Sequence, residues 1–217
     1  MRPTLAALMR SRALILLAMT LALAASPAHA LVQVWERLPA GLPADSLGAA
    51  LQRLERSDPR EVSAGAAFAL GQFRYARGEY RLAAEAFGRA AARLQGYDRA
   101  DARYRQGLAW LGHAEGGRAR AAFEEAASMS DPLKPFAQLG LARALALLGE
   151  PDLELATLRQ LLQTPGGEAE PAALERYVHA CERAHHASEA DAARARLLRD
   201  WPHSPEAARL TRRETRP

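Results

Sequence analysis

Apolar residues in the middle of the chain recur every three to four positions, the spacing that places side chains on one face of an α-helix. In residues 70–91, LGQFRYARGEYRLAAEAFGRAA, this spacing holds on both sides of Gly78. A glycine can take the positive φ that ends a helix. The stretch therefore predicts two helices joined by a short turn. Strand-forming β-branched residues are scarce along the whole chain, which favours an all-α fold.

The same arrangement of small and aromatic residues returns further along the chain. Gly71 and Phe87 correspond to Gly107 and Phe123, in each case 36 residues later. Ala83 and Ala90 likewise have counterparts in the second copy, and two weaker copies follow. Unrelated helix pairs would not keep a fixed interval. The copies begin at Ala64, Ala100, Pro135 and Pro171.

The first two copies resemble the tetratricopeptide repeat (TPR), a helix–turn–helix unit of about 34 residues. The residues that carry the resemblance are Leu70, Gly71, Gly78, Tyr80, Ala83, Phe87 and Ala90 in the first copy and Gly107, Trp110, Ala119, Phe123, Ala126, Asp131 and Pro132 in the second. The resemblance implies a right-handed α-solenoid of about four repeats with N- and C-terminal capping helices. It covers residues 64–205, divided into 64–99, 100–134, 135–170 and 171–205.

Residues 31–63 and 206–217 flank the repeats. Leu31–Pro43 is rich in proline and glycine and is expected to be irregular. Asp45–Arg56 has an apolar stripe and predicts a helix that covers the first repeat, because the end of a solenoid needs a cap. The last segment predicts a capping helix and a basic tail.

Three residues depart from the repeat pattern. Glu154 occupies the place of a close-contact alanine, so the third helix pair is splayed or the alignment slips by a residue or two. His185 occupies the place of the turn glycine, and Arg194 an aromatic place.

The first 30 residues have the pattern of a secretory signal peptide. Three arginines precede the apolar segment Ala13–Ala25, and Ala28-His29-Ala30 forms an A-x-A cleavage site. We expect cleavage after Ala30 and a periplasmic or secreted mature chain without membrane insertion. The alternative is an uncleaved anchor, although the apolar segment is shorter than the roughly 20 residues of a spanning helix.

The leader also changes the charge balance. The formal net charge of the chain is +4. Without the three leader arginines it falls to +1, because the leader contains no acidic residue. A chain so close to neutral has no general attraction for nucleic acid or an anionic membrane.

Neither a catalytic motif nor a metal-binding motif is found. His179, Glu182 and His186 share one helical face, and Cys181 and His185 share another. Both sets lack a known ligand spacing. We expect no enzyme activity, metal or cofactor.

The resemblance instead implies binding of another protein or peptide along the first helices of the repeats, which form the concave face of a solenoid. Self-association of an envelope assembly module is the alternative, and a homo-oligomer is possible in either case. Leu198–Ala207 resembles the repeat ends of periplasmic envelope-assembly proteins, which suggests an envelope scaffold. The candidate groove residues are Phe68, Gln72, Tyr75, Tyr104, Leu108, Leu111, Phe136, Leu139, Arg143, Glu175, His179, Glu182 and Arg183.

Overall fold

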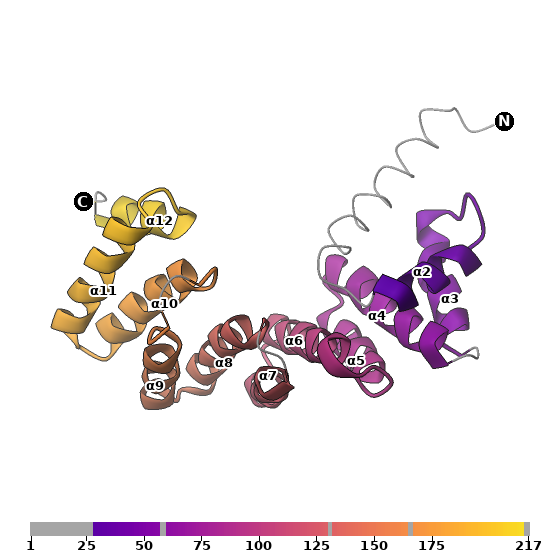
Figure 1. The fold of residues 1–217 in the computed structure, drawn as a ribbon, viewed down its shortest axis with the longest axis horizontal. Coiled ribbons are helices and arrows are strands. Elements are labelled where there is room, and N and C mark those ends of the chain that lie inside the picture. Colours follow the sequence, from indigo (N-terminus) through magenta and orange to yellow (C-terminus); the bar gives the residue numbers. More distant parts are fainter. Residues whose placement is uncertain (1–27, 57–59, 130–131, 165–166, 215–217) are drawn as a thin grey trace. The chain divides into compact units, whose positions relative to one another are not determined.

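The computed structural model describes residues 28–56, 60–129, 132–164 and 167–214. Within these ranges the chain forms only α-helices, which confirms the all-α prediction (Figure 1). Most of the leader, residues 1–27, lies outside the described residues. The helices are α2 (Ala28–Arg37), α3 (Ala44–Glu55), α4 (Arg60–Ala76), α5 (Tyr80–Ala91), α6 (Gly96–Gly112), α7 (Gly116–Met129), α8 (Lys134–Leu148), α9 (Pro151–Leu161), α10 (Glu170–Arg183), α11 (Ala187–Asp200) and α12 (Pro205–Glu214).

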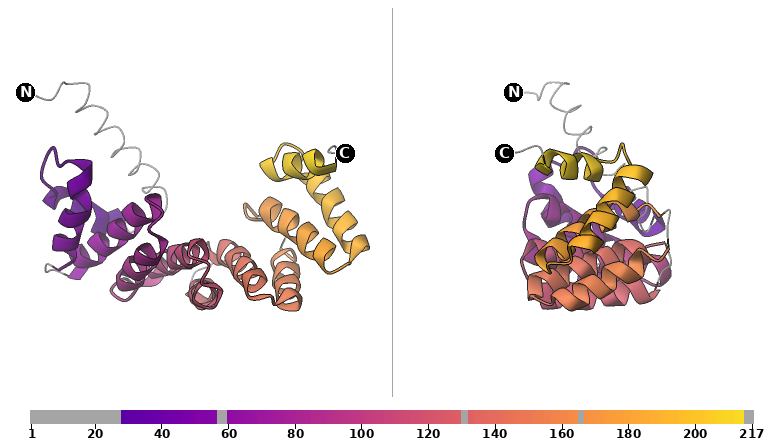
Figure 2. Two further views of the ribbon diagram at one scale, coloured as in Figure 1. Left: turned by 180° about the vertical axis from the view of Figure 1, so that it is seen from behind. Right: turned by 90° about the vertical axis from the view of Figure 1, so that its left-hand side faces the viewer.

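The helices group into two compact units, Met1–His113 and Ala114–Pro217. The first unit contains α2–α6 and the second contains α7–α12. Within each unit, most helices that follow one another in sequence pack together, as α4 does with α5 and α8 with α9, whereas α2 packs against α4 (Figure 2). The division between the units falls at the turn between α6 and α7.

The turns inside the four predicted repeats share one backbone feature. Each contains a residue with positive φ: Gly78 (75°), Ala114 (60°), Gly149 (74°) and His185 (60°). Their intervals of 36, 35 and 36 residues equal those between the predicted starts of the repeats. At His185 the N–H of the next residue donates to the carbonyl oxygen of Cys181 at 2.9 Å, and the equivalent bonds follow Gly78 and Gly149. This hydrogen bond belongs to the Schellman motif that ends a helix.

Glycine at the two turns that lack it should stabilise the chain. A side chain in the left-handed region costs about 1–2 kcal/mol, and the greater freedom of glycine in the unfolded chain cancels part of the gain. We expect Ala114→Gly and His185→Gly each to raise the free energy of unfolding by about 1 kcal/mol, measured by urea denaturation. The matched variant Gly149→Ala should lower it. A loss of stability in both glycine variants would contradict the assignment of these turns.

The segment after the leader differs from its prediction. Leu31–Pro43 was expected to be irregular, but it begins within α2, where Leu31 and Val34 are buried. These residues are three positions apart, and Leu38 continues the stripe, so one face of α2 packs against the first repeat. The prediction was wrong because Pro39, Gly41 and Pro43 all come after the end of this helix.

Capping helices cover both ends of the repeats, as predicted. In the first unit Leu51 of α3 is buried in a cluster with Val62 and Leu70 of α4. In the second unit Ala207 and Leu210 of α12 join the core formed by α9, α10 and α11.

Two phenylalanine rings pack onto glycines. The ring of Phe87 lies against Gly71, where an added Cβ would be 2.7 Å from a ring carbon. Phe123 of α7 lies against Gly140 of α8, where the same distance would be 2.4 Å. Both distances are too short for a methyl group, so the rings occupy space that the missing side chains leave open. Phe123 thereby joins one helix pair to the next.

Glu154 of α9 is 1% exposed and faces α10. Its Oε1 accepts a hydrogen bond from Nε of Arg176 at 2.9 Å, and its Oε2 accepts one from Nη2 of Arg183 at 2.7 Å. Burial lowers the pKa of Arg176, and the carboxylate opposes that effect. The acidic residue at a position expected for alanine is therefore accommodated by an ionic contact with the next helix pair.

Candidate functional site

The expected groove residues of α4 are Phe68, Gln72 and Tyr75, whose spacing places them on one face of the helix. Phe68 is fully buried. Its ring meets that of Phe87 edge to face with centroids 5.5 Å apart, and the guanidinium of Arg105 lies 5.3 Å from its centroid. The prediction that Phe68 lines a binding surface is therefore wrong, because α5 and an arginine of α6 cover it.

Arg105 is held over Phe68 by a buried carboxylate on its own helix. Asp101 is 2% exposed, and Nε of Arg105 donates to both of its oxygens at 3.0 Å. Burial raises the pKa of Asp101, and the positive charge of Arg105 opposes this shift. Through Arg105, the pair links α6 to Phe68 of α4. The i, i+4 spacing of these two residues is the sequence signal for the pair.

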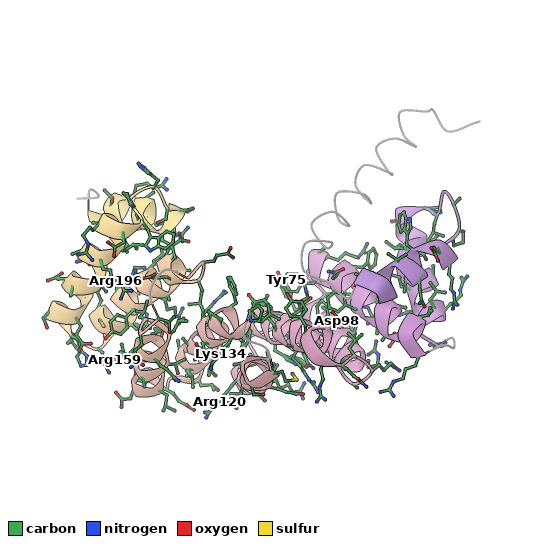
Figure 3. The ribbon with its side chains drawn as sticks, in the orientation of Figure 1. Tyr75, Asp98, Arg120, Lys134, Arg159 and Arg196 are labelled. Carbon is green, nitrogen blue, oxygen red and sulfur yellow. The ribbon has the colours of Figure 1, made fainter. Side chains whose placement is uncertain are left out.

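Tyr75, at the end of α4, is 39% exposed (Figure 3). Its ring meets that of Tyr80 edge to face, with centroids 5.3 Å apart. The ring of Tyr80 in turn lies against Gly112 of α6, where an added Cβ would be 2.8 Å from a ring carbon. Tyr75 therefore rests on a supported aromatic ring and keeps one face open to solvent.

The remaining first-unit candidates are half-buried. Tyr104, Leu108 and Leu111 repeat on α6 the spacing of the α4 residues, and Gln72 lies on α4. A half-buried side chain keeps atoms available to a partner without being free to move widely. We call these accessible residues the first-unit strip: Gln72, Tyr75, Tyr104, Leu108 and Leu111.

The second unit carries two different sets of candidates. Phe136 and Leu139 of α8 are half-buried, and Arg143 is exposed. The candidates on α10 are instead engaged with other helices or with each other. Both oxygens of Glu175 accept hydrogen bonds from Arg209 of α12 at 2.7 Å, and Arg183 pairs with Glu154.

Glu182 is also occupied, since it accepts from Arg194 of α11 at 2.7 Å and lies 3.2 Å from Nδ1 of His179. The acidic residues and Arg183 of α10 therefore hold the second unit together, and a partner would have to compete with these bonds. The sequence reasoning did not identify Arg194 or Arg209 as their partners.

Among the described residues, no three His, Cys, Asp or Glu side chains are grouped so that they could hold a metal ion. Cys181 is buried, and burial raises the pKa of its thiol. No helix in the described ranges is long and apolar enough to cross a membrane.

Sequence comparison finds no matching family model and no matching curated protein. Solved structures do match. YrrB, described as a TPR protein with an unusual peptide-binding site, has 15% identity and a TM-score of 0.59 over 77% of this chain and 84% of its own. A variant of a putative kinesin light chain from Podosopora anserina with nearly identical TPR-like repeats has 15% identity and a TM-score of 0.62 over 78% and 87%.

PilF of Pseudomonas aeruginosa has 20% identity and a TM-score of 0.54 over 86% of this chain and 79% of its own. Each match covers most of both chains. The chain has the tetratricopeptide-repeat fold.

Proposed function

We propose that the chain is a non-enzymatic scaffold that binds another protein or a peptide through the first helices of its repeats. The fold supports protein binding in general, because the similar structures are TPR proteins and YrrB carries a peptide-binding site. The observation that carries the proposal for this chain is the first-unit strip. It combines an exposed, supported tyrosine with half-buried apolar residues, the composition of anchor residues in interfaces.

The rigid support under the strip favours binding. Tyr75 rests on Tyr80, which in turn packs against Gly112, so the ring does not need to be ordered by its partner. Preorganised side chains lose less entropy on association. The strip is therefore suited to a peptide that brings apolar side chains against the tyrosine rings.

We further propose that the protein works in the periplasm or cell envelope. The signal-peptide pattern of residues 1–30 supports this location. Intact-mass analysis of the exported protein should give a chain that begins at Leu31. A mass that retains the leader would contradict the proposed processing.

The binding proposal is tested by comparing partners of the wild type with those of Tyr75→Ala/Tyr104→Ala after crosslinking. We expect the double variant to lose partners, because truncating two anchors commonly costs about 2 kcal/mol or more each. Tyr97→Ala is the matched control, since Tyr97 is 37% exposed on α6 but lies outside the strip. Identical partner sets for the wild type and the double variant, with both folded by circular dichroism, would contradict a role for the strip.

Self-association is the second candidate function. The terminal helix α2 leaves Val32 (47%) and Trp35 (43%) exposed on the side away from the core. Light scattering distinguishes the two functions. A concentration-dependent oligomer that dissociates in Trp35→Ser would favour self-association, and a monomer at all concentrations would favour a separate partner.

A further inference from the structure

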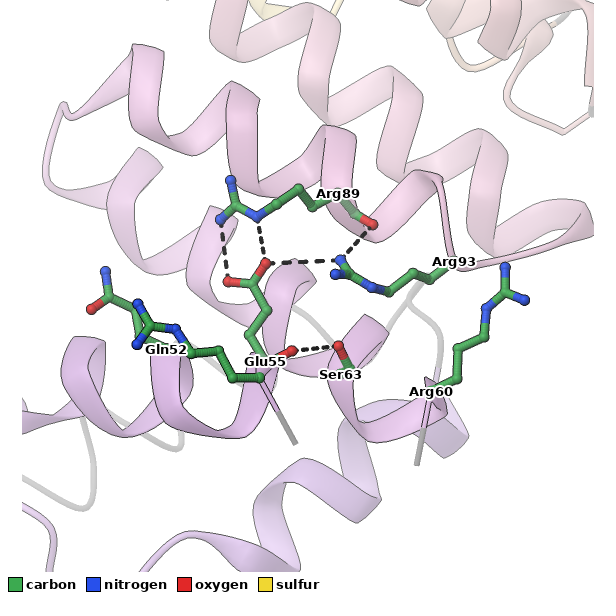
Figure 4. A pocket seen from close by; sticks show the side chains of 7 residues that line it. Gln52, Glu55, Arg60, Ser63, Arg89 and Arg93 are labelled. Atoms are coloured by element: carbon green, nitrogen blue, oxygen red, sulfur yellow. Dashed lines mark hydrogen bonds and ion pairs between the residues drawn. The ribbon is translucent and has the colours of Figure 1, made fainter. Parts of the chain in front are cut away.

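A pocket in the first unit lies apart from the strip. It has a volume of about 780 Å³, within the range of small-molecule sites. It lies where α3 and α5 end and α4 begins (Figure 4). Its lining residues are Gln52, Glu55, Arg56, Arg60, Ser63, Arg89 and Arg93.

The pocket is strongly basic. Its described lining residues include four arginines and a single carboxylate, that of Glu55. This carboxylate lies between Arg89 and Arg93 (Figure 4). Its Oε2 is 3.2 Å from Nη2 of Arg89, and its Oε1 is 3.8 Å from Nη1 of Arg93. Arg56 and Arg60 have no ion pair with the described residues, so the net charge of the described lining residues is positive even with Glu55 ionised.

The backbone of the pocket does not offset this charge. Carbonyl groups at helix C-termini repel anions when they are free. Here the carbonyl of Glu55 accepts from the Ser63 hydroxyl, that of Ala92 from Arg60 at 3.3 Å, and that of Arg89 from Arg93 at 3.0 Å. The helix α4 also begins in the pocket, and the N-terminal end of a helix favours an anion.

Many hydrogen-bond donors remain in the pocket after these contacts. A guanidinium group has five N–H bonds arranged in a planar fork. The guanidinium of Arg60 donates one hydrogen bond to Ala92, and that of Arg56 donates none to the described residues. This geometry suits the oxygens of phosphate, which arginine binds in a bidentate manner. A single carboxylate would leave most of the positive charge unbalanced.

We propose that this pocket binds a multiply charged phosphate anion, with Arg56 and Arg60 as its principal ligands. The volume accommodates a phosphate ester or pyrophosphate together with part of the molecule that carries it. A soluble phosphorylated compound and a phospholipid headgroup share this chemistry. The site is independent of the first-unit strip, so either can fail without the other.

Calorimetric titration of the mature chain with pyrophosphate tests the proposal. We expect binding that weakens as salt rises and that falls at least about tenfold in Arg56→Gln/Arg60→Gln. The control variant Arg37→Gln/Arg81→Gln removes the same charge from exposed positions of the same unit, outside the pocket, and should bind within about twofold of the wild type. Equal losses in the two variants, or no binding by the wild type, would overturn the proposal.

Two further experiments test how the anion is held and whether the ligand is a soluble compound or a lipid headgroup. Glu55→Gln removes the competing carboxylate and should tighten pyrophosphate binding, whereas weaker binding in a folded Glu55→Gln variant would argue against the proposed role of charge. Sedimentation with phosphatidic acid vesicles, compared with neutral vesicles, identifies a headgroup ligand if binding depends on Arg56 and Arg60. Pyrophosphate binding without vesicle binding identifies a soluble one.

Discussion

Replacing Glu154 with alanine is expected to lower the free energy of unfolding by about 3 kcal/mol. The carboxylate is 1% exposed and bonded to Arg176 and Arg183, whose side chains are 26% and 52% exposed. Arg183 can turn toward water when its partner is lost. Arg176 is more buried and would keep an uncompensated charge beside a new cavity. These exposures place the expected loss at the lower end of the range for broken buried ion pairs.

The control for this variant is Asp152→Ala. Asp152 is an exposed acidic residue in the first turn of the same helix, so its loss should cost no more than about 0.5–1 kcal/mol. Both variants are measured by urea denaturation. Equal stability changes would contradict the assignment of Glu154 as a buried link between α9 and α10.

Replacing Glu154, Arg176 and Arg183 together with apolar residues distinguishes the effect of their charges on stability from the effect of their packing. Glu154→Leu/Arg176→Met/Arg183→Met should recover most of the stability that Glu154→Ala loses, because no buried charge is then left without a partner. A triple variant that is less stable than Glu154→Ala would show that the ionic contact itself stabilises the unit.

Phe123→Ala is expected to lower the free energy of unfolding by about 3–5 kcal/mol. The ring is fully buried and fills the space above Gly140. Alanine would leave a cavity between α7 and α8, two helices that belong to different repeats. Thermal or urea denaturation of the purified variant measures the loss.

A double-mutant cycle shows whether Phe123 acts through Gly140. Gly140→Ala alone should lower the stability by about 1 kcal/mol, because its methyl group would be forced against the ring. In the Phe123→Ala background the same change should be stabilising, since the ring is gone and alanine favours helix. Gly117→Ala is the control, because no atom lies within 4 Å of an added Cβ there. Additive effects of Phe123→Ala and Gly140→Ala would contradict the contact.

Much of the fold could be predicted from the sequence because its signals are local. Gly78 and Gly149 mark turns by their own backbone conformation, and the constant interval extends that information to Ala114 and His185. Small residues beside large rings indicate where helices approach closely. The sequence does not predict α2 correctly. Pro39, Gly41 and Pro43 lie after this helix, but they suggest an irregular conformation for all of Leu31–Pro43.

The candidate site was harder to predict because exposure depends on tertiary contacts. Nothing in the spacing of Phe68 shows that Arg105 covers it. The ion pairs of the second unit also join residues far apart in sequence. Glu175 and Arg209 are separated by 34 positions, and Glu154 and Arg183 by 29. These separations are close to the repeat interval, so opposite charges about one repeat apart are the sequence signal for these pairs.

Site-specific photocrosslinking tests whether the first helices of the repeats contact a polypeptide partner. A photoreactive phenylalanine derivative replaces Tyr75 on α4 in one variant and Arg81, which is exposed on the second helix α5, in the other. We expect crosslinks to another polypeptide from position 75 and none from position 81. Crosslinks of equal yield from both positions, or from position 81 alone, would contradict binding through the first helices.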